Sequence, residues 1–130
     1  MKAKSYASLK RKLDSVFSEW TRRSSSDSRG RAACVTCGKI SRWQDQQCGH
    51  FIPRLYLAGR WNPDNCFVQC VLCNVFKHGN YPEFADYLIK HFGVERIRSL
   101  LALKRVTVKF TRADLQTKID FYKASIEALK

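Results

Sequence analysis

Four of the six cysteines stand in two pairs, and in each pair two residues separate the thiols. The pairs are Cys34 with Cys37 and Cys70 with Cys73. This spacing lets both sulfurs of a pair face one ion, and four thiolates are a common ligand set of tetrahedral Zn²⁺. Because four protein ligands leave no open position for a substrate, the predicted zinc ion is structural, and any catalysis must take place elsewhere in the chain.

The segment that contains the pairs also carries histidine and asparagine residues in a recognisable order. The stretches are QCGHF at residues 47–51, NPDN at 62–65 and CVLCNVFKH at 70–78. Together they resemble the HNH, or ββα-metal, nuclease motif, and the cysteine pairs resemble those of phage recombination endonucleases related to endonuclease VII. The chain is also similar to the NinG (Rap) recombination proteins of lambdoid phages, and this similarity extends to residues 101–104 and 111–115.

The resemblance implies a metal-dependent endonuclease and gives each polar residue a role. Hydrolysis of a phosphodiester needs a base for the attacking water and a cation for the developing negative charge. His50 would be the base, since an imidazole titrates near neutral pH, and Asn65 would orient it through a hydrogen bond. Asn74 would be an oxygen ligand of a catalytic Mg²⁺ or Mn²⁺, and His78, one helical turn further on, would bind the same metal or a phosphate.

One position departs from the pattern of the wider HNH class. In many of its members an Asp or a His that binds the metal precedes the catalytic histidine, whereas here the residue is Gly49. The missing ligand is left open between a water molecule and four side chains, which are Asp45, Asp64, Cys48 and His78. Cys66 is expected to be a buried thiol.

The charge of the chain indicates a polyanionic partner. Twenty-four Lys and Arg residues stand against eleven Asp and Glu residues, which gives a formal net charge of +13. The cations expected to contact DNA phosphates are Arg42, Arg54, Arg60 and Lys77. The aromatic residues among them are interpreted either as platforms for exposed bases or as a small core beside the zinc, and they are Trp43, Tyr56 and Trp61.

Apolar periodicity and turn-forming residues predict the elements that position these side chains. The expected elements are a helix over residues 5–22 with Ser5 as its N-cap, a polar linker over 24–30, short extended pieces over 31–80, and helices between Asn80 and Gly93, over 94–104 and from Thr111 to Leu129. Thr111 and Asp114 have a spacing like that of a capping box at the start of the last helix. The predicted fold is a small α+β protein. Its zinc-stapled ββα-metal (HNH) core at 31–80 is flanked by an N-terminal helix and linker (1–30) and a C-terminal helical segment (81–130).

The function expected from the resemblance is structure-selective cleavage of branched recombination intermediates, namely Holliday junctions and D-loops, in phage recombination. Two alternatives stay open: a non-catalytic zinc-containing DNA-binding module, and a general HNH nuclease that cuts duplex DNA. The apolar seam of the C-terminal helix could pack on the N-terminal helix or on a second protomer, so a homodimer is also open. No long apolar run occurs, so we expect a protein without a membrane partner, in the cytoplasm of a bacterial host cell.

Overall fold

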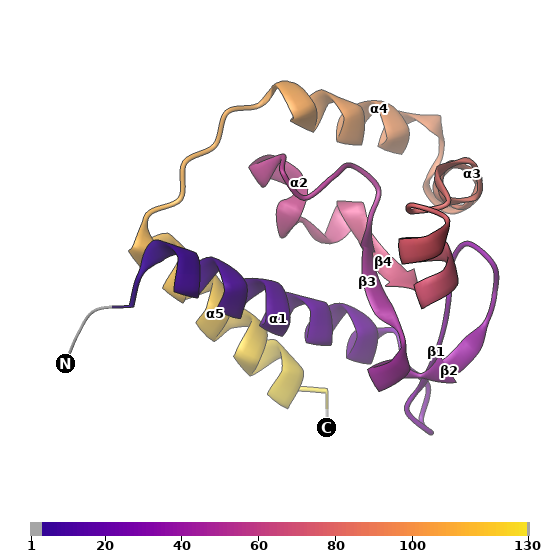
Figure 1. Cartoon of the computed structure of the whole chain (residues 1–130), viewed down its shortest axis with the longest axis horizontal. Helices are drawn as coiled ribbons and strands as arrows, with labels where there is room; N and C mark the ends of the chain where they lie inside the picture. The colour runs from indigo at the N-terminus through magenta and orange to yellow at the C-terminus, as the bar shows by residue number, and fades with distance from the viewer. Residues whose placement is uncertain (1–3, 130) are drawn as a thin grey trace.

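Two helices, α1 (Tyr6–Ser24) and α5 (Arg112–Glu127), run side by side in the same direction along one edge of the molecule (Figure 1). The computed structural model describes residues 4–129. Apolar residues on the facing sides of the two helices form the larger of two cores, together with two side chains from the middle of the chain. Its buried members are Leu9, Leu13, Val16, Phe17, Trp61, Cys66, Leu115, Ile119, Tyr122 and Ile126. The seam of α5 is therefore occupied by α1 of the same chain.

Both long helices begin at the caps that the sequence predicts. Ser8 N donates a hydrogen bond to Ser5 Oγ at 3.1 Å. Asp114 N donates to Thr111 Oγ1 at 3.0 Å, and Thr111 N donates to the Asp114 carboxylate at 2.8 Å. These bonds satisfy amides that have no partner inside a helix, so they define where each helix starts.

Two antiparallel strand pairs form the middle of the chain, and their strands are β1 (Arg31–Ala33) with β2 (Ile40–Arg42) and β3 (Gln47–His50) with β4 (Cys66–Gln69). In the second pair, His50 lies directly opposite Cys66. Residues opposite each other in an antiparallel pair point to the same face, so these two side chains share the face that lies against α1.

Short turns and two further helices complete the chain. They are η1 (Trp43–Asp45), α2 (Leu57–Arg60), η2 (Pro63–Asn65), α3 (Tyr81–Phe92), α4 (Val94–Ala102) and η4 (Leu103–Arg105). Helices α3 and α4 pack on the other side of β3 and β4 through a second core (Figure 1), whose buried members are Ile52, Phe84, Leu88 and Leu100. The predicted helices on either side of Gly93 are confirmed.

The chain after β4 does not form the regular helical turn that was expected to connect Asn74 and His78. It forms a single π-helical stretch, η3 (Leu72–Phe76), and a regular helix begins only at α3. His78, Gly79 and Asn80 have positive φ angles of 51°, 96° and 48°, so the backbone turns sharply between the two elements. The small α+β fold is confirmed, whereas its assignment to the ββα-metal class stays a prediction.

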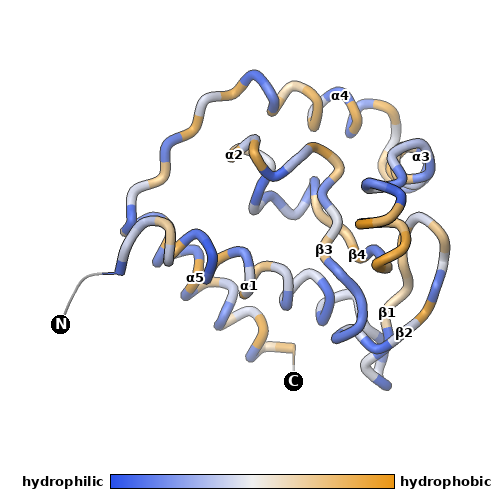
Figure 2. Tube along the Cα trace, viewed as in Figure 1, coloured by the Kyte–Doolittle hydropathy of each residue, from blue (hydrophilic) through white to orange (hydrophobic). Residues whose placement is uncertain are grey.

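Polar and apolar residues are interspersed along each helix (Figure 2). Within residues 4–129, none of the helices combines the length and the apolar character that crossing a bilayer requires.

Candidate functional site

The four paired cysteines converge at one point. Their sulfur atoms all lie within 4.8 Å of one another, and Cys37 Sγ is 3.6 Å from Cys70 Sγ. Tetrahedral zinc with Zn–S bonds of about 2.3 Å places its sulfurs about 3.8 Å apart, so the thiols have the spacing that Zn²⁺ needs. Two N–H groups also point at these sulfurs: Cys73 N to Cys70 Sγ and Asn80 Nδ2 to Cys73 Sγ, both at 3.5 Å. We call these four residues the four-thiol cluster.

The four-thiol cluster joins the two strand pairs. Its first cysteine pair lies on the turn between β1 and β2, where Cys34 N donates to Lys39 O at 2.9 Å. Its second pair follows β4 and enters η3. A metal ion held by all four thiols would therefore connect elements that share little apolar core of their own.

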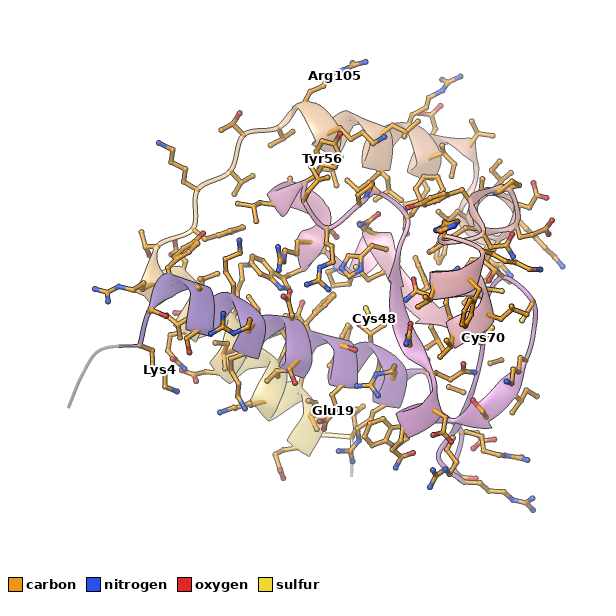
Figure 3. All side chains as sticks on the ribbon, in the orientation of Figure 1. Lys4, Glu19, Cys48, Tyr56, Cys70 and Arg105 are labelled. Atoms are coloured by element: carbon orange, nitrogen blue, oxygen red, sulfur yellow. The ribbon has the colours of Figure 1, made fainter. Side chains whose placement is uncertain are left out.

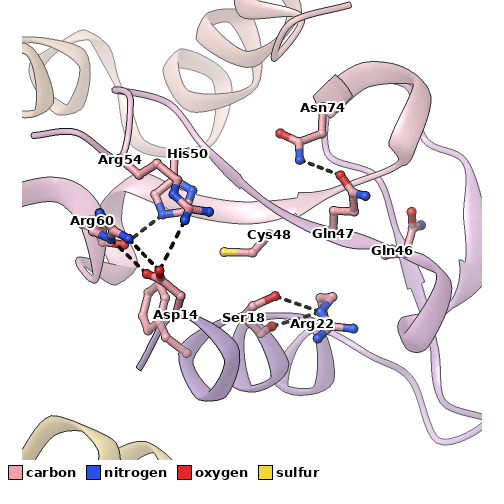
Figure 4. A pocket seen from close by; sticks show the side chains of 11 residues that line it. Asp14, Ser18, Arg22, Gln46, Gln47, Cys48, His50, Arg54, Arg60 and Asn74 are labelled. Carbon is pink, nitrogen blue, oxygen red and sulfur yellow. Dashed lines mark hydrogen bonds and ion pairs between the residues drawn. The ribbon is translucent and has the colours of Figure 1, made fainter. Parts of the chain in front are cut away.

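A separate hollow lies between α1, β3 and the segment around α2. It consists of two adjoining cavities of about 340 Å³ and 330 Å³, which share four lining residues: Cys48, His50, Arg54 and Asn74. The first cavity extends to α1, with side chains of that helix on its wall (Figure 4). We call the two cavities together the His50 groove. Cys48 lies between β3 and α1, whereas Cys70 lies on the other side of the strand pair (Figure 3).

The surroundings of His50 favour the neutral form of its imidazole. Its Nε2–H donates a hydrogen bond to the carbonyl oxygen of Arg60 at 2.8 Å. Burial lowers the pKa of His50 below its usual value, and the positive charges of Arg54 and Arg60 lower it further, against the Arg60 hydrogen bond and the Asp14 charge. Because Nε2 carries the proton, Nδ1 retains the lone pair, and this nitrogen can accept a proton from water.

Asp14 on α1 organises the cations beside His50, and the sequence reasoning missed it. Its carboxylate accepts hydrogen bonds from Arg60 Nε at 3.0 Å and Nη2 at 2.6 Å, from Arg54 Nη2 at 3.3 Å and from Trp61 Nε1 at 2.9 Å. Partial burial opposes ionisation of Asp14, but the hydrogen bonds and charges of these neighbours keep its pKa below the usual value. The available signal was its place as an acid two residues after the basic run Lys10–Lys12.

Arg60 and Trp61 therefore differ from the expectation for DNA contacts. The guanidinium of Arg60 is engaged by Asp14 and only 14% exposed, so its charge is largely neutralised inside the protein. Trp61 is buried in the core between α1 and α5, so it offers no platform for bases, and this core is separate from the cysteines beside which a small core was expected. Arg54 also pairs with Asp14, but its side chain is 61% exposed at the groove.

Asn65 does not orient the imidazole directly, which corrects the expectation. Its side chain is fully buried: Oδ1 accepts from Ile52 N at 2.8 Å, and Nδ2 donates to Ile52 O at 3.1 Å and Gly59 O at 3.0 Å. These bonds use both hydrogens of the amide and tie the chain after β3 to the end of α2. Asn65 thus fixes the backbone next to Arg60, whose carbonyl holds His50.

Asn74 and His78 both border the His50 groove, although no shared helix face places them there. Asn74 Nδ2 donates to Gln47 Oε1 at 2.7 Å, a bond that does not involve Asn74 Oδ1 (Figure 4). His78 lies past the end of η3 in the left-handed region, so the turn, and not a shared helix face, brings it to the same cavity as Asn74.

The structure explains why Gly49 stands where many HNH nucleases have a metal-binding Asp or His. A Cβ atom at this position would collide with the side chain of Gln69, which is buried on β4 opposite Gln47, the first residue of β3. A metal-binding Asp or His has no space there. Of the four candidates for the missing ligand, Cys48 and His78 line the groove, whereas Asp45 pairs with Arg42 and Asp64 pairs with Arg96 away from it.

The remaining cations expected to contact DNA lie outside the groove. Arg42 is exposed on β2, and Lys77 is exposed just after η3. Trp43 carries Arg22 and Arg23 over its ring at 5.2 Å and 5.1 Å, and Lys104 lies 5.6 Å from the Tyr56 ring. These contacts add to the positive surface around the groove without placing the aromatic rings inside it.

Comparisons with known proteins bear on the family. No curated protein and no solved structure is significantly similar to the chain. A family model described as "Bacteriophage Lambda NinG protein" matches residues 1–130. The relation to HNH nucleases and endonuclease VII stays a prediction. Since the match extends over every residue of the sequence, the chain belongs to the NinG family of phage proteins.

Proposed function

We propose that this NinG-family protein is a divalent-metal-dependent DNA endonuclease of the HNH type, and that it cuts branched recombination intermediates such as Holliday junctions and D-loops. The observation that carries the proposal is His50 at the end of β3. A fixed carbonyl orients this imidazole and burial favours its neutral form, beside an exposed arginine in a groove wide enough for a phosphate. A protein that only binds DNA has no need for a desolvated histidine at this position.

Three residues at or next to the groove have distinct roles in the proposed reaction. His50 Nδ1 takes a proton from the water that attacks phosphorus, and its Nε2–H stays on the Arg60 carbonyl. Arg54 binds a phosphate oxygen with the guanidinium edge that Asp14 leaves exposed. Asn65 keeps the Arg60 segment in place, so it acts on His50 only through the backbone.

Mg²⁺ or Mn²⁺ is the cofactor that fits the oxygen donors of the groove, and such an ion supplies charge stabilisation at the phosphate and at the leaving oxygen. The candidate ligands are the amide oxygen of Asn74 and the imidazole of His78. Both are neutral. Among the described residues that line the groove, Asp14 is the one carboxylate, and it is engaged by arginines. The DNA phosphate would therefore provide most of the negative charge around the ion.

Phosphate contacts account for most of the expected affinity for DNA. The net charge of +13 favours binding to any polyanion, and such binding weakens as salt rises. Two cuts across a junction call for two active sites, which a homodimer would provide. Because α1 already covers the apolar seam of α5, a second copy would have to use another surface.

The test compares a labelled four-way junction with a linear duplex of matched sequence, with and without Mg²⁺ or Mn²⁺. We expect metal-dependent cutting of the junction, and a loss of at least about 100-fold in His50→Ala, as for removal of a general base. DNA binding and the zinc of the four-thiol cluster should remain. His91→Ala is the matched control, because His91 is exposed on α3 and stacks on Tyr87 outside the groove.

Each other outcome selects a different function. Equal cutting of duplex and junction would favour a general HNH nuclease. Binding without cutting would leave a zinc-containing DNA-binding module. Cutting that survives in His50→Ala would contradict the role of His50 as the base.

A further inference from the structure

Three metal-ligating side chains outside the four-thiol cluster lie together at the floor of the His50 groove. One ligand atom each of Cys48, His50 and Cys66 lies within 4.8 Å of the other two. Strand pairing produces this cluster: His50 is opposite Cys66, and Cys48 precedes His50 by two residues and so points to the same face. The sequence holds these residues in no metal-binding motif, since Cys66 belongs to a different strand.

The donor set is soft. Two thiolates and one imidazole suit Zn²⁺, Co²⁺ or Cd²⁺, and they do not suit Mg²⁺ or Mn²⁺, which prefer oxygen. Three protein ligands leave a fourth coordination position open to a solvent molecule. Cys48 and His50 line the larger cavity, so an ion can reach them from the groove, while Cys66 closes the site from the core with 4% of its surface exposed.

Charge balance also favours a dication here. Binding of Zn²⁺ to two thiols and a neutral imidazole releases two protons, and the product carries no net charge. A neutral complex adds no unpaired charge to a partly buried site beside the ion pairs of Arg54 and Arg60 with Asp14.

We propose that Cys48, His50 and Cys66 form a second metal site, which binds Zn²⁺ and related soft cations independently of the four-thiol cluster. A neutral imidazole has one lone pair on its two nitrogens. A metal ion takes that pair whichever nitrogen it binds, so the same histidine cannot then accept a proton from water. Occupancy of the site by Zn²⁺ therefore blocks His50 as a base. This inhibitory step rests on the proposed nuclease function, whereas the metal binding does not.

The binding test uses protein that holds a single zinc ion per chain, in the four-thiol cluster, kept in a non-thiol reductant, and Co²⁺ is added as a probe. We expect one cobalt ion per chain, with a thiolate-to-cobalt charge-transfer band, while the zinc of the four-thiol cluster stays bound. Cys48→Ser should weaken cobalt binding by at least about tenfold, since even partners outside the first coordination shell change metal affinity by that factor. His78→Ala is the matched control, because this imidazole borders the groove but lies outside the cluster.

Two results of the binding test would overturn the site. One is a wild-type protein that takes up no cobalt beyond exchange at the four-thiol cluster. The other is an unchanged cobalt affinity in Cys48→Ser, provided that far-ultraviolet circular dichroism shows both proteins to be folded. Cys66 is unsuitable as the first variant, because it is buried in the core. Its substitution could lower the stability of the fold as well as the affinity for cobalt, and the two effects could not be told apart.

The activity test measures junction cutting in Mg²⁺ at rising Zn²⁺, with each protein compared with its own rate without added zinc. The zinc concentration for half inhibition should rise at least about tenfold in Cys48→Ser. It should stay unchanged in His91→Ala, because this imidazole is exposed on α3 outside the groove. Equal inhibition of wild type and Cys48→Ser would contradict the inhibitory role. If no protein cuts DNA, the proposed function fails, and the cobalt measurement still decides whether the metal site exists.

Discussion

The two thiol clusters of this chain differ in how they are built and in what surrounds them. The four-thiol cluster consists of two local pairs, and three of its four cysteines are buried. The cluster of Cys48, His50 and Cys66 is assembled across a strand pair, and two of its members face the His50 groove. The first has four ligands and no room for chemistry, while the second has three ligands beside a pocket.

Because of this difference, we expect the four-thiol cluster to stabilise the fold and the His50 groove to carry the function. A closed metal site contributes free energy to the folded state and offers nothing to a substrate. The groove contributes little to stability, but it holds a desolvated imidazole, an exposed arginine and amide oxygens in one place. Substitutions in the two regions should therefore have effects that differ in kind and in size.

The largest effect is expected for Cys70→Ser in the four-thiol cluster. Structural zinc supplies on the order of 10 kcal/mol of folding free energy, which is comparable to the whole stability of a small domain. Losing a ligand should therefore unfold at least residues 31–80 and release the zinc. Urea unfolding followed by circular dichroism, with zinc content measured in parallel, checks this.

Cys48→Ser is the matched variant for that comparison, since it removes a thiol from the other cluster. It should keep the zinc ion and unfold cooperatively close to the wild-type midpoint. If Cys70→Ser also unfolded cooperatively near that midpoint, the four-thiol cluster would not be what stabilises the middle of the chain.

The regularities that the sequence could predict are local ones. The spacing of the paired cysteines, the Ser5 cap, the capping box at Thr111 and the helix break at Gly93 each depend on residues within a few positions of one another. All four structural expectations are confirmed, and the helices that carry them lie where the apolar periodicity placed them.

The parts that the sequence could not predict depend on tertiary contacts. Asp14 pairs with Arg60 only because α1 packs against the segment after β3, and nothing in the helix itself indicates that partner. The role of Asn65 was inferred from the resemblance alone, and the backbone groups that bind it lie on two separate segments. Gly49 lacks a side chain because Gln69 on the neighbouring strand fills that space.

The second prediction concerns Asn65, on which the stability of the groove depends. Asn65→Ala removes three hydrogen bonds and leaves the N–H and C=O groups of Ile52 without these partners, while Gly59 O still accepts from Asn62 N. The expected loss of unfolding free energy is about 3 kcal/mol, measured by urea denaturation with the zinc retained. Asn62→Ala, which loses one exposed capping bond to Asp64 N, should cost about 1 kcal/mol. A variant of Asn65 with normal stability and lost cutting would instead restore its direct role at the imidazole.

The smallest effect is expected for Asp14→Asn, and it concerns pH. His50 acts as a base only when neutral, so cutting should fall as pH drops through the pKa of His50. The negative charge of Asp14 raises that pKa, whereas the charges of Arg54 and Arg60 lower it. Replacing the carboxylate by an amide of the same shape removes the raising influence, so the acid limb of kcat/KM should move to lower pH. Asp120→Asn, on the exposed side of α5, should leave the profile unchanged.

An acid limb that stays in place in Asp14→Asn, or moves to higher pH, would contradict the electrostatic coupling between α1 and the proposed base. The same variant also separates the two regions of the molecule. Because Asp14 touches no residue of the four-thiol cluster in its hydrogen bonds and ion pairs, zinc content should be unaffected while the pH profile shifts. A shift without zinc loss would place the control of His50 in the helix that covers the groove, outside the four-thiol cluster.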